Sequence, residues 1–214
     1  KIFDNDFSNN IKKELSYDLT NDQTNALNEI NKDLKSEEKM FRLLQGDVGS
    51  GKTIVALISC LNVVNSGYQV AFMAPTEILA YQHYKLAQSL IKDKMKIGFL
   101  TSKTDYSKRK KIINDLETNE IKILFGTHSV FQEKINYKKL GLIVIDEQHK
   151  FGVKQRKKLS DKGGKNCDVL VMSATPIPRT MIMTVFGDMD VTIIKQKPKN
   201  RKPVKTYSKV DTKL

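Results

Sequence analysis

The amino-acid sequence predicts an α/β fold in which a mostly parallel central sheet carries helices on both faces. Two features of the 214-residue chain lead to this prediction. Short runs of Val, Ile and Leu recur along it, and such continuous apolar runs are typical of strands that are buried on both faces. Longer segments with the periodicity of helices separate these runs, and this alternation is the pattern of a parallel sheet.

The expected elements form a single lobe over residues 1–194, with a helical segment at about 1–38 before the first strand. Strands are expected at residues 41–45, 70–74, 97–100, 121–125, 142–145, 169–172 and 191–194. Helices are expected near residues 21–35, 52–65, 77–92, 106–117, 153–161 and 177–186. Residues 195–214 lack a periodic pattern and are rich in Lys, which indicates an exposed basic linker.

The composition narrows the class of protein. With 39% hydrophobic and 29% charged residues, the chain can bury a core, which argues against disorder. Its 37 Lys and Arg exceed its 24 Asp and Glu, and the net charge of +13 favours nucleic acid as a partner, although a general bias towards Lys gives the same excess. No apolar stretch has the length of a membrane span, and Cys60 and Cys167 are too few for a disulfide framework. We interpret the chain, which starts at Lys1, as part of a longer cytoplasmic protein.

A phosphate-binding loop is predicted between the first strand and the helix at 52–65. Four residues separate Gly46 from Gly51, and Lys52 and Thr53 follow, as in the P-loop pattern. The expected nucleotide-binding residues of this loop are Gly46, Asp47, Val48, Gly49, Ser50, Gly51, Lys52 and Thr53. Glycine lets successive N–H groups turn inward onto phosphate oxygens, and the helix that follows adds its positive dipole end. We therefore expect Lys52 to reach the β- and γ-phosphates of a nucleotide and Thr53 to bind Mg²⁺.

An acidic pair ends a later apolar strand, where residues 142–145 run into Asp146 and Glu147. A carboxylate at the carboxyl end of a neighbouring parallel strand faces the same crevice as the loop. Asp146 is thus expected to bind Mg²⁺, and Glu147 to orient and deprotonate an attacking water. Lys52, Asp146 and Glu147 together are the predicted catalytic residues.

Five further segments occur in the order of known helicase motifs. They are Leu19-Thr20-Asn21-Asp22-Gln23, Ala74-Pro75-Thr76-Glu77-Ile78-Leu79-Ala80 with Gln82-His83, Gly126-Thr127-His128-Ser129-Val130-Phe131-Gln132, Asp146-Glu147-Gln148-His149 and Ser173-Ala174-Thr175-Pro176. This order resembles the superfamily-two helicases and translocases, and within them the RecG family. The related transcription-repair coupling factors usually carry Glu where Gln148 stands, so Gln148 and the tail at 201–206 favour RecG. Tyr17 and Ser102 depart from the RecG pattern, which usually has Phe and Gly there.

The resemblance implies one lobe with the RecA-like fold of P-loop NTPases, with ATP and Mg²⁺ as cofactors. It implies that Gln23 reads adenine and that His149, Ser173 and Thr175 couple the nucleotide site to movement. The implied contacts to a DNA backbone are Thr76, Glu77, Gly126, Thr127 and His128. Two ordinary alternatives stay open, namely that Gln23 is a polar residue on a helix surface and that residues 75–77 only cap a helix.

The function implied by the resemblance is that of an ATP-binding lobe in a DNA translocase. Such a protein couples ATP hydrolysis to the remodelling of branched or duplex DNA at replication forks and recombination junctions. The second RecA-like lobe, its arginine finger and the wedge domain are missing from the sequence, so the isolated lobe is expected to be poorly active. The alternatives are the equivalent lobe of a transcription-repair coupling factor, a nucleotide- and DNA-binding module without turnover, and a P-loop kinase. Residues 74–77 and 173–175 argue against a kinase, which does not need them.

Overall fold

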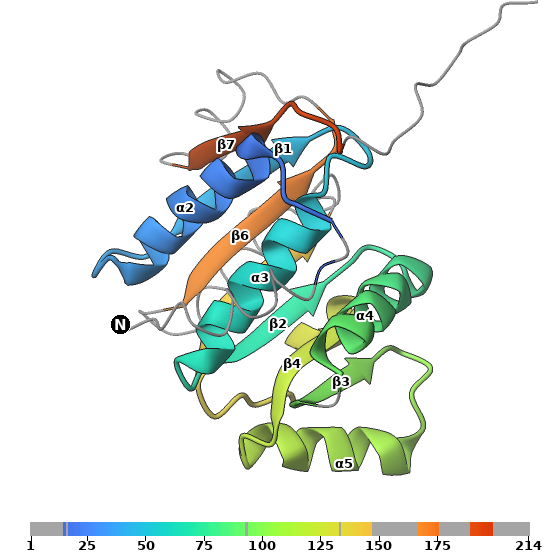
Figure 1. Cartoon of the computed structure of the whole chain (residues 1–214). Coiled ribbons are helices and arrows are strands. Elements are labelled where there is room, and N and C mark those ends of the chain that lie inside the picture. Colours follow the sequence, from blue (N-terminus) through green and yellow to red (C-terminus); the bar gives the residue numbers. More distant parts are fainter. Residues whose placement is uncertain are drawn as a thin grey trace, which may run out of the picture.

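A seven-stranded sheet forms the centre of the described part of the computed structural model (Figure 1). The structure describes residues 15, 17–92, 94–132, 134–146, 167–175 and 189–198. The strand order is β3-β4-β2-β5-β6-β1-β7, and every neighbouring pair is parallel. The strands are β1 (Phe41–Gly46), β2 (Gln69–Met73), β3 (Lys96–Leu100), β4 (Ile121–Gly126), β5 (Leu140–Asp146), β6 (Asp168–Ser173) and β7 (Asp190–Ile194). All seven expected strands are present, and the predicted fold class is confirmed.

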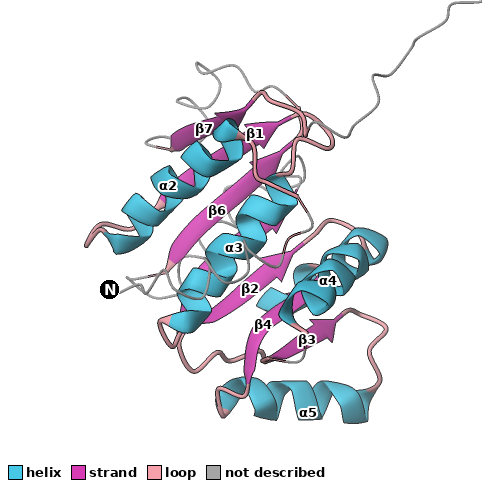
Figure 2. Ribbon diagram, viewed as in Figure 1, coloured by secondary structure: helices cyan, strands magenta, loops and turns pink. Residues whose placement is uncertain are grey.

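Helices cover both faces of the sheet (Figure 2). The first face carries α2 (Asn21–Lys35), α3 (Lys52–Asn65) and α4 (Glu77–Ile91), and the second carries α5 (Tyr106–Glu117) and the 3₁₀ helix η1 (His128–Phe131). The chain moves towards the β3 edge from β1 to β2 and from β2 to β3, and then back from β3 to β4. Connections of one hand therefore place α5 opposite α3 and α4. The helices expected at 153–161 and 177–186 lie outside the described residues.

The central strands send alternate residues into two separate apolar clusters. On β5, Leu142 and Val144 enter the cluster that also contains α2, α3 and α4 residues. Ile143 and Ile145 of the same strand enter the opposite cluster, together with Leu116 of α5. Because both faces of the sheet are covered, consecutive positions are apolar, which explains the continuous apolar runs in the sequence.

Helix α3 is buried along almost its whole length. Every residue from Ile54 to Val64 is buried, because α2 packs beside α3 and the sheet lies beneath both helices (Figure 1). The Nδ2 of Asn62 on α3 donates to the Asn31 side chain on α2 at 2.8 Å, whereas its buried Oδ1 has no hydrogen-bond partner among the described residues. Within the described ranges, no helix combines the length and the apolarity that crossing a membrane requires.

Parallel pairing brings the carboxyl ends of all seven strands to one edge of the sheet. The order of strands divides this edge into two parts. The P-loop half follows β5, β6 and β1, and carries Asp146, Ser173 and the loop at 46–53. The outer half follows β3, β4 and β2, and carries the segments at 101–104 and 126–128 and the start of α4. The two halves meet where β2 pairs with β5.

Arg42 on β1 is a buried charge that fastens α2 to the sheet. Arg42 is 8% exposed. Its guanidinium donates to Asp33 at 2.7 Å and to Glu29 at 3.1 Å, both on α2. It also donates to the Thr192 hydroxyl on β7 at 2.7 Å. Because Nε and Nη1 have hydrogen-bond acceptors and Nη2 lies 3.7 Å from the Asp190 carboxylate, this burial is compatible with stability.

We expect Arg42→Met to lower the free energy of unfolding by about 2 kcal/mol, because the two carboxylates lose charge-assisted hydrogen bonds but regain water. At this chain length, that loss corresponds to a fall in melting temperature of roughly 4–8 °C, measurable by circular dichroism. Lys108→Met is the control, because its ion pair with Asp105 is exposed, at 76% and 71% of the two side chains, and such pairs contribute less than about 1 kcal/mol. Equal melting temperatures for the two variants would contradict the role of Arg42.

Candidate nucleotide and nucleic-acid site

The loop at 46–53 connects the end of β1 to the start of α3. Two of its glycines have backbone angles that L side chains rarely adopt, with φ of +79° at Gly49 and +89° at Gly51. The N-cap of α3 is Gly51, which has no side chain to cap the helix. The first N–H groups of α3 therefore receive no hydrogen bond from an N-cap side chain. This strand–loop–helix arrangement is the setting that phosphate binding requires.

The Lys52 side chain lies over this loop. The residue is 9% exposed, and its ammonium donates to the carbonyl oxygens of Gly46 and Asp47. Within the described residues, the buried Ser50 hydroxyl has no hydrogen-bond partner. A buried cation, an unpaired hydroxyl and a helix start therefore converge here, and this donor set fits a polyphosphate. Thr53, in the first turn of α3, adds a hydroxyl that suits a hard cation.

Gln23 is fully buried and joins α2 to the loop. It is 1% exposed, its Nε2 donates to the Ser50 carbonyl at 2.8 Å, and its Oε1 accepts from the Thr20 backbone at 2.9 Å. Thr20 and Gln23 thus form a capping box at the start of α2. Gln23 is therefore not a residue on the helix surface, and its amide spans from the α2 cap to the P-loop.

A pocket of about 960 Å³ opens beside Gln23. Its lining includes Tyr17, Leu19, Gly49 and Ile54, which combine apolar side chains with the backbone of the P-loop. Partial burial raises the pKa of the Tyr17 phenol, because desolvation disfavours the phenolate. A pocket of this size, next to a phosphate-binding loop, suits a nucleotide base and sugar.

The segment after β7 forms another wall of this pocket. Gln196, Lys197 and Pro198 line it, and the backbone N–H groups of Lys195 and Gln196 both donate to Asp22 at 2.8 Å. The ammonium of Lys197 lies 3.4 Å from the Asp47 carboxylate in the P-loop. Residues 195–197 are exposed, as expected for a linker, but they are attached to the start of α2 and to the P-loop.

Asp146 lies at the carboxyl end of β5, on the same edge as the P-loop. Its register partner on β6 is Met172, which also pairs with Leu44 on β1. One strand thus separates Asp146 from β1, a distance of about 10 Å at the usual strand spacing. The Asp146 side chain is 12% exposed and accepts a hydrogen bond from His83 on α4, with 2.7 Å between Oδ2 and Nε2. Glu147 and His149 lie outside the described residues.

Ser173 ends the strand between Asp146 and the P-loop. Its hydroxyl lies 3.1 Å from the Thr175 hydroxyl and accepts from the Thr175 backbone N–H at 3.2 Å. Ser173 is buried, whereas Thr175 is exposed. Two of the three expected coupling residues, Ser173 and Thr175, thus contact one another in a compact turn at the centre of the P-loop half.

Thr76 and Glu77 start α4 in the outer half. The exposed Thr76 is the N-cap, and its hydroxyl accepts from the Leu79 backbone at 3.2 Å. Glu77 instead turns to the segment after β3, where its carboxylate contacts the Lys103 ammonium at 3.1 Å and the Ser102 hydroxyl at 3.4 Å. The hydrogen bond from Lys103 lowers the pKa of the Glu77 carboxyl. Glu77 therefore holds the segment at 101–104 against the start of α4.

Gly126, Thr127 and His128 follow β4. A Cβ at Gly126 would lie 2.0 Å from the Leu100 carbonyl oxygen, so only glycine permits this approach of β3 and β4. The Thr127 side chain is half-buried and His128 is exposed. Arg109 on α5 braces the same corner, because its guanidinium donates to the Thr101 carbonyl at 2.9 Å. The predicted nucleic-acid residues therefore lie at the ends of two adjacent strands, β2 and β4.

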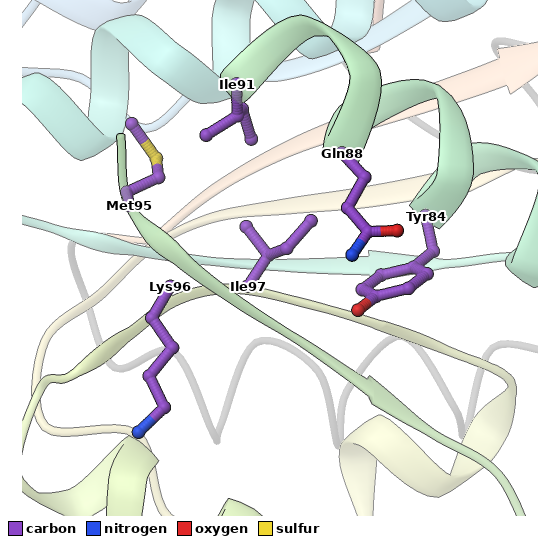
Figure 3. A pocket seen from close by; sticks show the side chains of 6 residues that line it. All are labelled: Tyr84, Gln88, Ile91, Met95, Lys96 and Ile97. Carbon is purple, nitrogen blue, oxygen red and sulfur yellow. The ribbon is translucent and has the colours of Figure 1, made fainter. Parts of the chain in front are cut away.

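A smaller pocket of about 170 Å³ lies between α4 and β3 (Figure 3). Tyr84, Gln88 and Ile91 of α4 face Ile97 of β3 there. The Lys96 ammonium points away and pairs with Asp115 at 2.8 Å, on the far side of the strand. Among the described residues that line this pocket, none aims a charged group into it, so they offer little chemistry for a ligand.

The fold and the site are those of a helicase motor lobe. The model of the DEAD/DEAH box helicases matches residues 20–184, and the chain belongs to this family. Within it, the chain is 50% identical over 195 residues to the ATP-dependent DNA helicase RecG of Thermotoga maritima, and 50% identical over 196 residues to that of Bacillus subtilis. Each match covers 91% of this chain but only 25% and 29% of the two relatives.

Solved structures agree with this assignment. A structure of RecG bound to a three-way DNA junction matches with a TM-score of 0.83 and 42% identity, over 95% of this chain and 27% of that one. The DEAD-box helicase Mss116, bound to single-stranded RNA, matches with a TM-score of 0.65 at 19% identity over 91% of this chain and 44% of that one, which supports the fold alone. The resemblance to RecG that the motifs predicted is confirmed.

Three contacts of the site were not expected from the sequence. They are the hydrogen bond between His83 and Asp146, the bond from Gln23 to the P-loop and the bracing of residue 101 by Arg109. His83 and Gln23 belong to motifs that single them out in the sequence. Nothing in those motifs indicates which residues they contact. Arg109 stands in a run of basic residues on α5 that has no feature to distinguish it from solvated neighbours.

Gly51→Ala is expected to weaken nucleotide binding at least tenfold, because its Cβ would lie 2.2 Å from the Gln23 Nε2 at a residue with φ of +89°. Backbone strain of this kind costs about 1–3 kcal/mol, and displacement of Gln23 adds to it. Titration with a fluorescent ADP analogue measures the affinity, and thermal unfolding measures the strain.

Gly67→Ala is the matched control for this substitution. Gly67 has a φ of +84°, but no atom lies within 4 Å of the Cβ position. The control should lose stability through strain and retain the affinity for nucleotide. If Gly51→Ala binds nucleotide as well as Gly67→Ala does, then Gln23 and the P-loop are not linked in the way described above.

Proposed function

We propose that this chain is the ATP-binding lobe of a RecG-like DNA translocase, which couples ATP hydrolysis to the remodelling of branched DNA. The observation that carries the proposal is the convergence of the P-loop and Asp146 on one edge of the sheet, with a single strand between them. The names and the DNA junction of the RecG relatives support the choice of DNA as substrate. The proposed lobe spans residues 1–194, and residues 195–214 lead to a second RecA-like lobe.

ATP would bind with its phosphates on the loop at 46–53 and its base in the pocket beside Tyr17. Lys52 would exchange its carbonyl partners for the β- and γ-phosphate oxygens, which are stronger acceptors for an ammonium group. The Gln23 amide would support the base-binding wall through its bond to the Ser50 carbonyl, and its remaining donor and acceptor capacity would suit the edge of adenine. Positioning of this kind is the main source of catalysis in phosphoryl transfer.

Thr53 and Asp146 would hold Mg²⁺, since a hydroxyl and a carboxylate are the oxygen ligands that this ion prefers. Bound Mg²⁺ would offset the negative charge of the β- and γ-phosphates. Glu147, the residue after the end of β5, would orient the attacking water and accept its proton. We assign Ser173, Thr175 and His149 to the coupling of the nucleotide site to movement of the lobes.

DNA would bind across the outer half of the edge through its phosphate backbone. Thr76, Gly126, Thr127 and His128 would offer hydroxyl, amide and imidazole donors at two strand ends, and such contacts read no base sequence. Glu77 would act indirectly, by holding the segment at 101–104 through Lys103. The wedge domain and the second lobe belong to the proposed complete protein, and the isolated lobe would lack the arginine that is worth about 10³–10⁵ in rate.

A different motor and a module without turnover are the competing functions. The lobe of a transcription-repair coupling factor is not favoured, because the relatives described above carry the RecG name over 91% of this chain. A module that only binds nucleotide would not need a carboxylate opposite the P-loop, so Asp146 distinguishes it from a motor lobe.

Asp146→Ala tests the proposal in a binding experiment with and without Mg²⁺. The wild-type chain should bind a fluorescent ATP analogue more tightly when Mg²⁺ is present, by about tenfold or more, because Thr53 and Asp146 would hold an ion whose charge would offset that of the phosphates. The variant should lose most of this gain and keep the metal-free affinity that Lys52 supplies. If the gain from Mg²⁺ survives in Asp146→Ala, the metal ligand is assigned wrongly, and the motor interpretation loses its main support.

A further inference from the structure

The hydrogen bond between His83 and Asp146 crosses the boundary between the two halves of the functional edge. His83 lies about two turns along α4 from Thr76, the N-cap that faces the outer half. Asp146 belongs to the P-loop half. The two side chains are 9% and 12% exposed, and 2.7 Å separates Nε2 from Oδ2. A charge-assisted bond of this length, largely shielded from water, is among the stronger hydrogen bonds in proteins.

The imidazole of His83 packs against a pair of aromatic rings on the strands of the outer half. Its ring centroid lies 5.0 Å from that of Phe72 on β2. Phe72 in turn stacks on Phe125 of β4, with 5.1 Å between centroids. Both phenylalanines are fully buried, so the ring beneath His83 belongs to the core. The position of His83 thus depends on α4, β2 and β4, whereas the position of Asp146 depends on β5.

We propose that His83 is a positioning residue that couples the DNA-binding half of the edge to the metal-binding carboxylate. The inference rests on the proposed function, because it assigns Asp146 to Mg²⁺. The imidazole N–H engages one carboxylate oxygen and fixes the rotamer of Asp146, which leaves the second oxygen for the metal or its water. Partners that orient a metal-binding side chain in this way typically change metal affinity by about 10–100-fold when they are removed.

Coupling follows from the rigidity of α4. The helix begins at the Thr76 cap, where a DNA phosphate would bind, and a continuous helix carries any displacement there to His83. The length of helix between the two residues is only about 10 Å. DNA binding at the helix start would therefore change the geometry of Asp146 without any direct contact between DNA and the nucleotide.

Two variants of His83 separate positioning from general stability. His83→Leu fills the same space with an apolar side chain and removes the Nε2–H donor. His83→Gln instead places an amide N–H near the position of Nε2. Gln88→Ala is the control at an exposed residue of the same helix, beside the pocket between α4 and β3. The Mg²⁺ concentration that half-saturates the binding of a fluorescent ATP analogue is the first measurement, and thermal unfolding is recorded alongside it.

We expect His83→Leu to raise this Mg²⁺ midpoint about tenfold and to leave the metal-free nucleotide affinity unchanged. His83→Gln should restore the midpoint to within about threefold of the wild type, and Gln88→Ala should match the wild type. If His83 had only a structural role, His83→Leu and His83→Gln would both be less stable, and the Mg²⁺ midpoint would not be higher in His83→Leu than in His83→Gln. The inference is overturned if both His83 variants have the wild-type Mg²⁺ midpoint while Asp146→Ala has lost the response to Mg²⁺. If Asp146→Ala also retains the response, the metal assignment itself has failed.

The second measurement uses the full-length protein that contains this lobe. His83→Leu should bind a DNA junction with unchanged affinity, and the ratio of DNA-stimulated to basal ATP hydrolysis should fall at least fivefold. His83→Gln should recover most of the stimulation. Full stimulation by DNA in His83→Leu at saturating Mg²⁺ would contradict the coupling through α4.

Discussion

The parallel pairing of all neighbouring strands is the constraint on which the rest of the structure depends. Parallel strands present their carboxyl ends at a single edge, so every residue that follows a strand emerges on the same side of the molecule. The order of strands then decides which of these residues become neighbours. Because β6 lies between β1 and β5, the loop at 46–53 and Asp146 come together, although more than ninety residues of chain separate them.

The same constraint explains the polar groups that the fold buries. A polar side chain that is buried at the end of a covered strand has lost water as a partner, so it is more stable when a protein group replaces that water. Gln23 pairs with the Thr20 and Ser50 backbones, Asp146 pairs with His83, and Lys52 pairs with loop carbonyls. Together these contacts tie α2 to the P-loop and α4 to the end of β5.

Local pattern sufficed to predict most of the architecture. The strands are short and apolar because both faces are covered, and the helices at 21–35, 52–65 and 106–117 begin and end where the periodicity predicted. The P-loop and Asp146 were also predictable, because each lies at a strand end with a chemically distinctive residue. The strand β5 is longer than expected at both ends, because Gly141 separates Leu140 from the continuous apolar run and Asp146 is charged.

Contacts between distant segments could not be predicted in the same way. His83 and Asp146 are 63 residues apart, and no local pattern states which acid a buried histidine meets. The linker at 195–198 looked unstructured because it lacks periodicity, but its backbone N–H groups bind Asp22, and backbone groups leave no trace in a sequence. The strand order that creates these contacts is a property of the whole sheet.

Replacing Mg²⁺ by Fe²⁺ on bound ADP and adding hydrogen peroxide gives the most direct test of the central claim. Fe²⁺ reduces the peroxide to hydroxide and a hydroxyl radical and is itself oxidised to Fe³⁺, and the radical cuts the nearest backbone. If the P-loop and the tip of β5 share one metal ion, mass spectrometry should find two cuts in the same molecule, one near Thr53 and one near Asp146. Both cuts should disappear when ADP is omitted. A cut near Thr53 with none near Asp146 would contradict the convergence of the two segments on one nucleotide.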